Sequence, residues 1–430
     1  MRKTLTTAIV GFALSASAQA EISWQQVDDL VAATQPQVVE WRRWFHENPE
    51  LSNREFNTAA RLAEILRGMG LEPKTGIAHT GLVAIIEGGK PGPMVAIRTD
   101  IDGLPVTERT GEPFASTATT EYNGQATGVM HACGHDAHMA MVLGAASVLN
   151  ELRADLAGSV MLIFQPAEEG QPVGEEGGAE LMLKEGIFEQ KPAAVFGAHV
   201  WWEVPAMRLA VHDGPAMAAA DRFTIKVTGK QSHGSQPWNG IDPIVVAAQI
   251  VMGLQTIASR QVNVTLAPSV ISLGMIHGGI RNNIIPDDVE LVGTIRTFNQ
   301  EMRDDIHARV RRTAVSIAES AGATATVDIP TGTPSLVNSR ELVAALGPTF
   351  ERVAGEQGLY PFLPVTAAED FAFFSNQVPA IYFFIGAVAP GVDYKTSPGN
   401  HSPLFNVYEP VMEIGVQAFT HAVVDYLQAQ

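Results

Sequence analysis

Cysteine is almost absent from this chain of 430 residues: Cys133 is the only one, so no internal disulfide bond can form. Basic residues are also few, since 28 Lys and Arg face 46 Asp and Glu, and the formal net charge is −18. This acidic balance argues against nucleic acid or an anionic membrane surface as a partner. Beyond the N-terminus, no run reaches the roughly 18 apolar residues of a transmembrane helix. We therefore expect neither a nucleic-acid nor a membrane partner.

Two common catalytic signatures are missing as well. The chain has no G-x-S-x-G elbow, which would present a nucleophilic serine, and no glycine-rich phosphate loop. The segment Gly88-Gly89-Lys90 lacks the spacing of such a loop and the helix that should follow it. The chemistry must therefore come from other residues.

The first twenty residues have the composition of a secretory signal peptide. Met1-Arg2-Lys3 is a charged start, an apolar run extends from Leu5 to Ala16, and Ala18-Gln19-Ala20 is an A-x-A cleavage site. We predict that residues 1–20 are a cleaved signal peptide and that the mature protein is periplasmic or secreted. An exported protein with one cysteine gains no stability from disulfides.

The remaining residues exceed one ordinary core, so two domains are expected. Leu62, Ile65, Leu66 and Met69 recur at helical spacing, which predicts a helix over residues 41–70. Apolar runs at 94–97, 160–164 and 194–198 predict buried strands, and a helix is predicted over residues 137–152. Continuous apolar strands that alternate with helices indicate a mainly parallel mixed sheet with helices on both faces.

The pattern changes between residues 217 and 330. Apolar residues alternate at 223–227 and 289–295, which predicts half-buried strands, and further strands are predicted at 270–273 and 323–329, with helices at 242–259 and 299–321. The order β-α-β-β-α-β is that of a ferredoxin-like α+β unit. The first pattern resumes with a helix at 340–355 and a strand at 380–385. We predict a catalytic domain of residues 21–216 and 331–430, into which residues 217–330 are inserted as a second domain.

Groups able to bind metal follow the predicted strands, where ligands bind in parallel sheets. They are Asp100, Asp102, Cys133, His135, Glu168, Glu169, His199 and His401. Imidazole, thiolate and carboxylate together suit zinc, manganese or cobalt. Eight groups exceed the need of one tetrahedral ion, so a pair of ions that shares a bridging ligand and a water fits better. A thiolate can bridge two ions.

The adjacent pair Glu168 and Glu169 can divide the work. One carboxylate can bind metal while the other acts as a general base and then passes the proton to the leaving group. The residue pair alone does not assign these roles. Taken singly, a Glu-Glu pair in a loop is most often solvated surface, and Asp100 and Asp102 could simply cap a turn.

Histidines outside this set are expected to be structural. His131 and His138 are predicted to support the site, and six others are predicted to have no role in it: His46, His79, His212, His277, His307 and His421. A rival interpretation makes Cys133 a nucleophile paired with His135. Residues two apart rarely face each other in this way, and an exposed reactive thiol is an oxidation liability outside the cytoplasm. A metal ligand is therefore favoured.

Ordered motifs along nearly the whole mature chain carry a family resemblance. They are the segments 45–51, 97–105, 130–138, 165–170, 197–201, 283–287, 293–298, 368–371 and 401–405. The chain resembles the aminoacylase/carboxypeptidase family of co-catalytic metallopeptidases (clan MH). It is most similar to the branch of hippurate hydrolase, N-acyl-amino-acid amidohydrolases and auxin-conjugate hydrolases.

The resemblance implies a role for each matching residue. Two divalent metal ions per subunit (Zn, Mn or Co) are implied, with Glu168 as general base and Asp102 orienting a ligand. Asp100 stands where other branches carry a ligating histidine, which puts its contact with metal in doubt. The implied metal ligands are Cys133, as the bridge, with His135, Glu169, His199 and His401.

The resemblance also extends to the inserted domain, which is similar to the family's dimerisation or lid domain and implies a homodimer. There His233 matches a histidine that reaches into the partner subunit's site and steadies the oxyanion. Without the resemblance, His233 would be taken for a turn histidine. Asn283 fits a substrate-binding asparagine, and Arg281 is a candidate for the substrate carboxylate.

The sequence as a whole favours an exported, metal-dependent amidohydrolase that cleaves the amide bond of N-acyl amino acids. The main alternative is a dipeptidase or carboxypeptidase with the same chemistry. A non-catalytic exported binding protein on this scaffold is a third possibility, which the complete ligand set disfavours. The aromatic pair Trp201-Trp202 and the unusual Trp238 argue against copying an acyl preference from any one relative.

Overall fold

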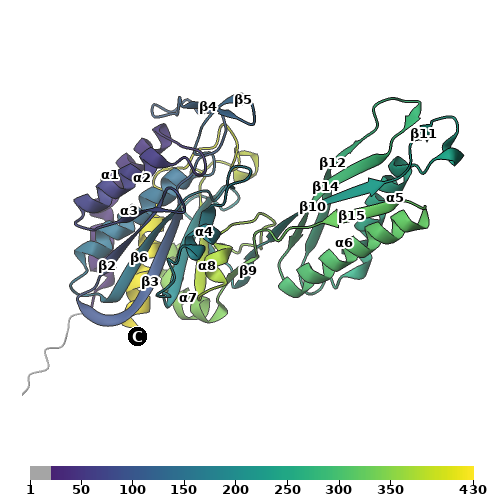
Figure 1. The fold of residues 1–430 in the computed structure, drawn as a ribbon. Helices are drawn as coiled ribbons and strands as arrows, with labels where there is room; N and C mark the ends of the chain where they lie inside the picture. The colour runs from purple at the N-terminus through teal and green to yellow at the C-terminus, as the bar shows by residue number, and fades with distance from the viewer. Residues whose placement is uncertain (1–20) are drawn as a thin grey trace, which may run out of the picture.

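The computed structural model describes residues 21–430, and the predicted signal peptide at 1–20 lies outside the described residues. The chain forms two bodies joined by a narrow connection (Figure 1). The larger body contains both ends of the described chain, and the smaller one is built from its middle. This arrangement follows from the sequence pattern, because the residues that resume the first pattern return to the first sheet.

The larger body is organised around a seven-stranded mixed sheet. Its strands in spatial order are β1 (Lys74–Ile77), β2 (Gly81–Glu87), β6 (Ala157–Gln165), β3 (Lys90–Asp100), β7 (Ala194–Trp201), β17 (Ala380–Gly386) and β8 (Leu209–Val211). The central strands β6, β3, β7 and β17 are parallel, whereas β1, β2 and β8 pair antiparallel. The predicted mainly parallel mixed sheet is confirmed.

Helices cover both faces of this sheet. One face carries α1 (Trp24–Glu47), α2 (Phe56–Gly68), α3 (His135–Glu151), α7 (Arg340–Ala354) and α9 (Val411–Gln428). The short helices α4 (Gly178–Lys184) and α8 (Ala372–Ser375) contribute to a second core on the other face. Helix α3 is buried along nearly its whole length, because it packs between the sheet, α1 and α9. The N-terminus of α3, where Cys133 and His135 lie, is therefore held firmly in place.

The helix predicted over residues 41–70 is wrong in its extent. Helix α1 already begins at Trp24, where the Ser23 side chain accepts a hydrogen bond from the Gln26 N–H, and it ends at Glu47. A separate helix, α2, begins at Phe56. Pro49 disfavours helical backbone in the residue before it, and Asn53 adopts a φ of 59°. The apolar spacing therefore predicted helix α2 correctly, but not the end of α1 or the break between the two helices.

The smaller body contains a four-stranded antiparallel sheet in the order β12-β14-β10-β15. Along the chain its elements are β10 (Ala219–Thr228), α5 (Pro243–Thr256), β12 (Ser269–Gly278), β14 (Asp288–Thr297), α6 (Gln300–Ser320) and β15 (Thr324–Asp328). This is the predicted β-α-β-β-α-β order, with its own hydrophobic core. A short pair, β11 (Ser232–His233) with β13 (Ile284–Ile285), lies at its outer end (Figure 1). The pair β9 (Gly214–Met217) and β16 (Leu336–Asn338) lies where the chain leaves and re-enters the larger body.

The expectation that no later segment could span a membrane needs correction. Residues Pro243–Gln261, which form α5 and a following π-helical turn, are long and apolar enough by length and composition alone. However, Val246, Ile250 and Leu254 are buried against the sheet of the smaller body. The segment therefore packs one face against the core of the smaller body, and its high hydropathy also reflects apolar side chains on its exposed face, such as Met252.

Candidate metal centre

Polar residues gather at the carboxyl edge of the central parallel strands. Strand β3 ends at Asp100 and β6 at Gln165, and β7 carries His199 near its end. Helix α3 begins at His135, directly after Gly134, whose φ is 97°. A side chain at Gly134 would strain this backbone, and a Cβ would lie 2.3 Å from Val200 Cγ2. Only glycine therefore lets the chain turn tightly from Cys133 into α3.

Two groups of three donors meet at Cys133. One consists of Cys133, His135 and His199, and the other of Cys133, Glu169 and His401, with the donor atoms of each group within 4.8 Å of one another. The Cys133 Sγ lies 3.4 Å from His199 Nε2 and 3.3 Å from His401 Nε2. The structure thus brings together all five predicted ligands. The thiol is the only donor that both groups share, as a bridging position requires.

The two buried histidines are held so that one nitrogen faces this cluster. His135 Nδ1 lies 2.8 Å from the Asp102 carbonyl oxygen, and His199 Nδ1 lies 2.7 Å from that of Val200. With Nδ1 donating to these carbonyls, Nε2 is left as the acceptor that a metal uses. Burial lowers the pKa of His199, which keeps its imidazole in the neutral, ligating form.

Asp102 connects the histidine to the loop of the glutamate pair. Its carboxylate accepts hydrogen bonds from the backbone N–H groups of Glu168, at 3.1 Å, and Glu169, at 3.0 Å. The Ser52 hydroxyl donates a third bond of 2.7 Å, and His135 Nδ1 lies 3.3 Å from the same carboxylate. The geometry agrees with the predicted orienting role of Asp102.

Two buried polar atoms in the cluster form no hydrogen bond with a described residue. They are His135 Nε2 and Glu169 Oε1, which lie 3.9 Å apart, and Glu169 Oε1 also lies 3.1 Å from His401 Nε2. Leaving such atoms unsatisfied is costly, and a divalent cation between them would satisfy both. Burial and the carboxylates of Glu169 and Glu168 raise the pKa of the Cys133 thiol well above its usual range. A bound cation would reverse this effect and favour the thiolate. The residues present therefore fit a metal pair.

Asp100 and His138 are committed to other contacts. The Asp100 carboxylate lies 2.8 Å from His138 Nδ1 and accepts a 2.9 Å hydrogen bond from Arg98. The second His138 nitrogen accepts the backbone N–H of Val200 at 2.8 Å. These contacts use the atoms that a metal would need. His138 thus acts as the predicted support, tying β3 to β7. His131 is also buried beside the site, but neither ring nitrogen has a partner among the described residues.

Glu168 lies at the edge of the cluster. Its Oε2 is 3.8 Å from His135 Nε2, and its carboxylate also forms a close group with those of Glu369 and Asp370. Burial, Glu369 and Glu169 raise the pKa of Glu168 well above its usual range. A carboxyl group with a raised pKa is suited to accept and then release a proton.

Sequence reasoning assigned no role to Glu369 and Asp370. Arg98, which is fully buried, lies 3.0 Å from a carboxylate oxygen of each, and it donates to Gln165 at 2.7 Å. Tyr382 donates a 2.5 Å hydrogen bond to Glu369. The segment containing Glu369 and Asp370 carried the family resemblance, but both residues lie far along the chain from Glu168. Only the fold reveals that they surround it.

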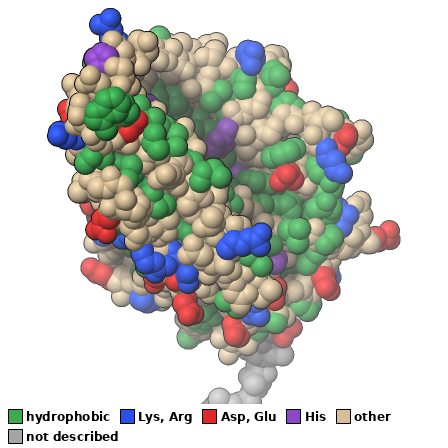
Figure 2. Space-filling view, turned by 90° about the vertical axis from the view of Figure 1, so that its right-hand side faces the viewer, with side chains coloured by type: hydrophobic (Ala, Val, Ile, Leu, Met, Phe, Trp, Pro, Cys, Tyr) green, Lys and Arg blue, Asp and Glu red, His purple; other side chains and the backbone are tan. Residues whose placement is uncertain are grey.

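A cavity of about 550 Å³ opens onto the metal cluster between the two bodies. Trp201 and Trp202 contribute aromatic surface to it, and Arg296 enters it from β14 of the smaller body. Arg296 is half-buried, burial lowers its pKa, and no hydrogen bond or ion pair joins its guanidinium to a described residue. Figure 2, which faces the smaller body, shows a histidine inside a hollow of the surface.

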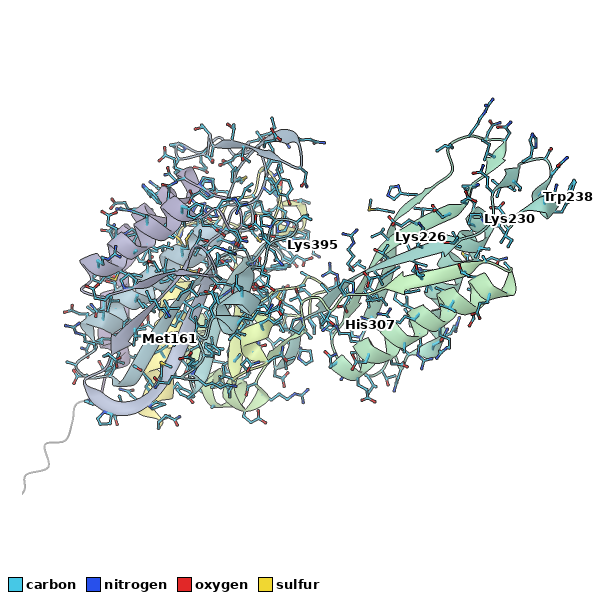
Figure 3. All side chains as sticks on the ribbon, in the orientation of Figure 1. Met161, Lys226, Lys230, Trp238, His307 and Lys395 are labelled. Carbon is cyan, nitrogen blue, oxygen red and sulfur yellow. The ribbon has the colours of Figure 1, made fainter. Side chains whose placement is uncertain are left out.

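The structure does not bring His233, Arg281 and Asn283 to the cluster within one chain. His233 is exposed on β11, where its Nδ1 accepts the Ser235 N–H at 3.1 Å. Arg281 and Asn283 are exposed beside it, in the segment that leads into β13. This end of the smaller body also holds Trp238, which stands at the outer tip, away from the larger body (Figure 3).

Comparison with known proteins agrees with these observations. The model of the peptidase family M20/M25/M40 matches residues 96–425. A thermostable carboxypeptidase 2 of Saccharolobus solfataricus is 39% identical over 390 residues, covering 90% of this chain and 94% of the relative. An IAA-amino acid hydrolase of Arabidopsis thaliana is 33% identical, covering 99% of this chain and 95% of the relative.

A solved structure supports the fold. The crystal structure of a dinuclear metal-binding peptidase of the M20 family from Bacillus subtilis is 33% identical, with a TM-score of 0.78. The structural match covers 93% of this chain and 100% of the Bacillus subtilis chain.

The fold and the comparisons define a hydrolase of a metal-dependent family, and its donor residues are placed so that they could hold two ions. The chain belongs to the peptidase family M20/M25/M40, whose members here include hydrolases of amides and peptides. The predicted resemblance and the mixed α/β fold class are confirmed, whereas a dimerisation or lid role of the smaller body stays a prediction.

Proposed function

We propose that this protein is an exported amidohydrolase that cleaves the amide bond between an acyl group and an amino acid with a free α-carboxylate. One observation carries the proposal. The cavity that holds Glu168 and the metal donors also holds the guanidinium of Arg296, which pairs with no described residue. A free carboxylate on the substrate would form an ion pair with that guanidinium, since arginine binds carboxylates through paired hydrogen bonds.

Glu168 is the proposed general base. Two bound divalent ions would supply an activated water and polarise the substrate carbonyl. The Glu168 carboxylate takes a proton from the attacking water and then delivers it to the leaving nitrogen. Glu168 lies beside His135, and Asp102 holds its loop through two backbone N–H groups. These contacts would keep the Glu168 carboxylate directed at the reacting atoms. The five ligands proposed from the sequence retain that role.

Arg296 replaces Arg281 as the proposed carboxylate-binding residue in a single subunit. Arg281 is exposed at the far end of the smaller body, whereas Arg296 lines the cavity itself. Trp201 and Trp202 provide apolar contact for the amino acid held there. The Trp201 ring packs edge to face against His199, with the two ring centroids 5.3 Å apart.

A homodimer is proposed because His233 and Asn283 need a second copy to reach a metal cluster. Strand β12 lies at the edge of its sheet and exposes Met275 and Ile276, while α5 exposes Met252. An apolar edge strand is a natural surface for pairing with another chain. His233 of the partner subunit would then donate to the oxyanion of the reaction.

A carboxypeptidase or dipeptidase is the second candidate, and the identity to a thermostable carboxypeptidase favours it. The same groups would serve, because a peptide also presents an amide next to a terminal carboxylate. Zinc, manganese and cobalt all suit the mixed thiolate, imidazole and carboxylate set. Export is proposed on the composition of residues 1–20.

The decisive experiment is a substrate panel assayed with metal-stripped and metal-restored protein. The panel contains N-acetyl, N-benzoyl and indole-acetyl amino acids, simple dipeptides, and each compound's α-carboxamide analogue. We expect N-acyl amino acids to be hydrolysed after metal is restored, with the carboxamides much poorer. Preferential cleavage of dipeptides would favour the second candidate. Absence of hydrolysis across the panel by protein shown to contain metal would refute the proposal.

A further inference from the structure

The backbone takes an unfavourable conformation directly before the glutamate pair. Ala167 has a φ of 53°, in the left-handed region that favours glycine, although it carries a Cβ atom. A left-handed alanine is costly unless its surroundings hold it, and such residues gather at functional sites. Because Glu168 follows this turn, the backbone of Ala167 sets the direction in which the proposed general base leaves the loop.

A buried acid holds this turn. Glu55 is fully buried, and its Oε1 accepts the backbone N–H of Ala167 at 2.9 Å. Its Oε2 accepts the hydroxyl of Thr80 at 2.6 Å. Glu55 directly precedes α2, but its carboxylate forms no capping hydrogen bond with the described residues of that helix. The side chain therefore serves the loop of the glutamate pair rather than its own helix.

The same loop also packs against strand β2. Gly81 begins that strand, and a Cβ there would lie 2.7 Å from Pro166 Cδ. The absence of a side chain therefore lets Pro166 approach the β2 backbone closely, next to the residue whose hydroxyl reaches Glu55. Together these contacts hold the chain on the side of the loop that leads into Glu168.

Glu55 and Asp102 hold different parts of the loop. The Asp102 carboxylate accepts the N–H groups of Glu168 and Glu169. It also lies 3.3 Å from His135 Nδ1, so it acts on two proposed metal ligands. Glu55 holds only the N–H before Glu168, and its carboxylate forms no hydrogen bond with a proposed ligand in the part of the chain that the structure describes. Loss of Glu55 should therefore disturb the base and leave the metal ligands in place.

We propose that Glu55 is a positioning residue of the reaction, which directs the Glu168 carboxylate toward the reacting atoms by holding the left-handed turn at Ala167. This inference rests on the proposed function, in which Glu168 is the general base. Without its acceptor, the turn can relax toward the negative φ that alanine prefers. A misplacement of about 1 Å at a catalytic group can cost about 100-fold in rate. The loss should appear in kcat, because the proposed substrate contact at Arg296 lies elsewhere.

The acceptor atom of Glu55 matters for this role, and its charge does not. Burial and the charge of Asp102 raise the pKa of Glu55 to about 7. A neutral carboxyl group still accepts the Ala167 N–H through its carbonyl oxygen, and a side-chain amide does the same. Glu55→Gln can also donate to the Thr80 hydroxyl. This conservative variant should keep the turn, whereas an apolar side chain of similar size cannot.

The test compares Glu55→Gln with Glu55→Leu in metal-loaded, full-length mature protein, on the N-acyl amino acid that the wild type hydrolyses best. Metal content is measured by elemental analysis alongside kcat and KM. We expect Glu55→Leu to lose about 10- to 100-fold in kcat at unchanged metal content, with KM within about twofold. Glu55→Gln should stay close to the wild type. The matched control is Glu50→Leu, which removes the acceptor of the Thr58 N–H at the start of α2 and should lower stability without lowering kcat.

Two further variants keep the test decisive. Glu55→Asp keeps the charge but is too short to reach the Ala167 N–H, so it should also lose kcat, and it replaces Glu55→Leu if that variant does not fold. Ala167→Gly accepts a positive φ without strain. Added to Glu55→Leu or to Glu55→Asp, it should restore part of the lost kcat, whereas it should restore nothing to Glu168→Gln.

Several results would overturn the proposal while leaving the proposed function intact. They are a wild-type kcat in Glu55→Leu or Glu55→Asp, a loss of metal in proportion to activity, equal losses in Glu55→Gln and Glu55→Leu, an equal loss in Glu50→Leu, and no recovery with Ala167→Gly. By contrast, a metal-loaded wild type that hydrolyses no N-acyl amino acid would refute the proposed function, and the inference with it.

Discussion

The carboxylate of Asp102 accepts the backbone N–H of Glu169 in a 3.0 Å hydrogen bond, although the two residues follow different strands. The same carboxylate lies 3.3 Å from His135 Nδ1. A single side chain thus aligns two proposed metal ligands, and it also holds the N–H of Glu168.

We predict that Asp102→Asn weakens metal binding by about 10- to 100-fold, as is usual when a partner of a metal ligand is lost. The asparagine keeps the shape of the side chain but replaces one acceptor with a donor, which faces a backbone N–H. Metal affinity is measured by competition with a chelator, and activity is then assayed at saturating metal. Ser52→Ala is the milder comparison, because it removes only one donor to Asp102. Unchanged affinity in Asp102→Asn would contradict the orienting role.

Glu168→Gln should retain both metals and lose about 10²- to 10⁴-fold in kcat, the usual contribution of a general base. Glutamine fills the same space but cannot accept the proton. Metal content is measured by elemental analysis alongside kcat. Glu176→Gln, at an exposed glutamate of the same loop, should behave like wild type. A fully active Glu168→Gln variant would assign the base to another residue.

Arg296→Gln should raise KM about 10- to 100-fold for substrates with a free α-carboxylate, because one charge-assisted contact is worth about 1.5–3 kcal/mol. The carboxamide analogues should be hydrolysed by variant and wild type alike. Arg281→Gln is the matched comparison, and it distinguishes the residue inside the cavity from the one expected from the sequence. If Arg281→Gln alone raises KM, the sequence-based assignment is correct.

The meeting of the donor residues could be predicted because Glu169 and His199 follow predicted strands, and Cys133 directly precedes a predicted helix. Parallel strands bring their carboxyl ends to one edge, where the next helix begins, so sequence order was enough to place these three residues together. Arg296 lies in the motif of residues 293–298, but the sequence assigned it no role, since on an alternating strand it is expected to be an exposed side chain. Its position in the cavity depends on how the smaller body faces the larger one. The helix break after Glu47 was missed because the apolar spacing was extended across Pro49.

Mixing two inactive variants should restore activity if His233 acts across a dimer. Glu168→Gln has an intact His233, and His233→Ala has an intact Glu168. In a mixed dimer, the subunit with Glu168 receives His233 of the partner subunit and becomes active. Activity is followed after the two proteins are unfolded and refolded together, with each refolded alone as a control. If His233 serves its own chain, or if the protein is a monomer by light scattering, no activity will return.

Asp221 should contribute strongly to the stability of the smaller body. Its buried carboxylate contacts Arg303 at 2.5 Å and His307 at 2.8 Å, and it accepts the Gly332 N–H where the chain returns to the larger body. Burial acts to raise the pKa of Asp221, but these partners outweigh it and hold the pKa well below its usual range. Breaking such a buried pair costs about 3–5 kcal/mol, so Asp221→Asn should lower the free energy of unfolding by that order.

The pH dependence follows from the direction of this shift. Because the folded-state pKa is depressed, the stabilisation is fully present above the unfolded value of about 3.9 and is lost as pH falls through the folded value. The difference between wild type and Asp221→Asn, measured by urea unfolding, should therefore persist from pH 8 to about pH 5 and shrink as the pH falls further. Asp288→Asn breaks the half-exposed pair with Lys226 and should cost less than about 1 kcal/mol. Equal losses in the two variants would show that burial of the Asp221 cluster contributes nothing beyond a surface ion pair.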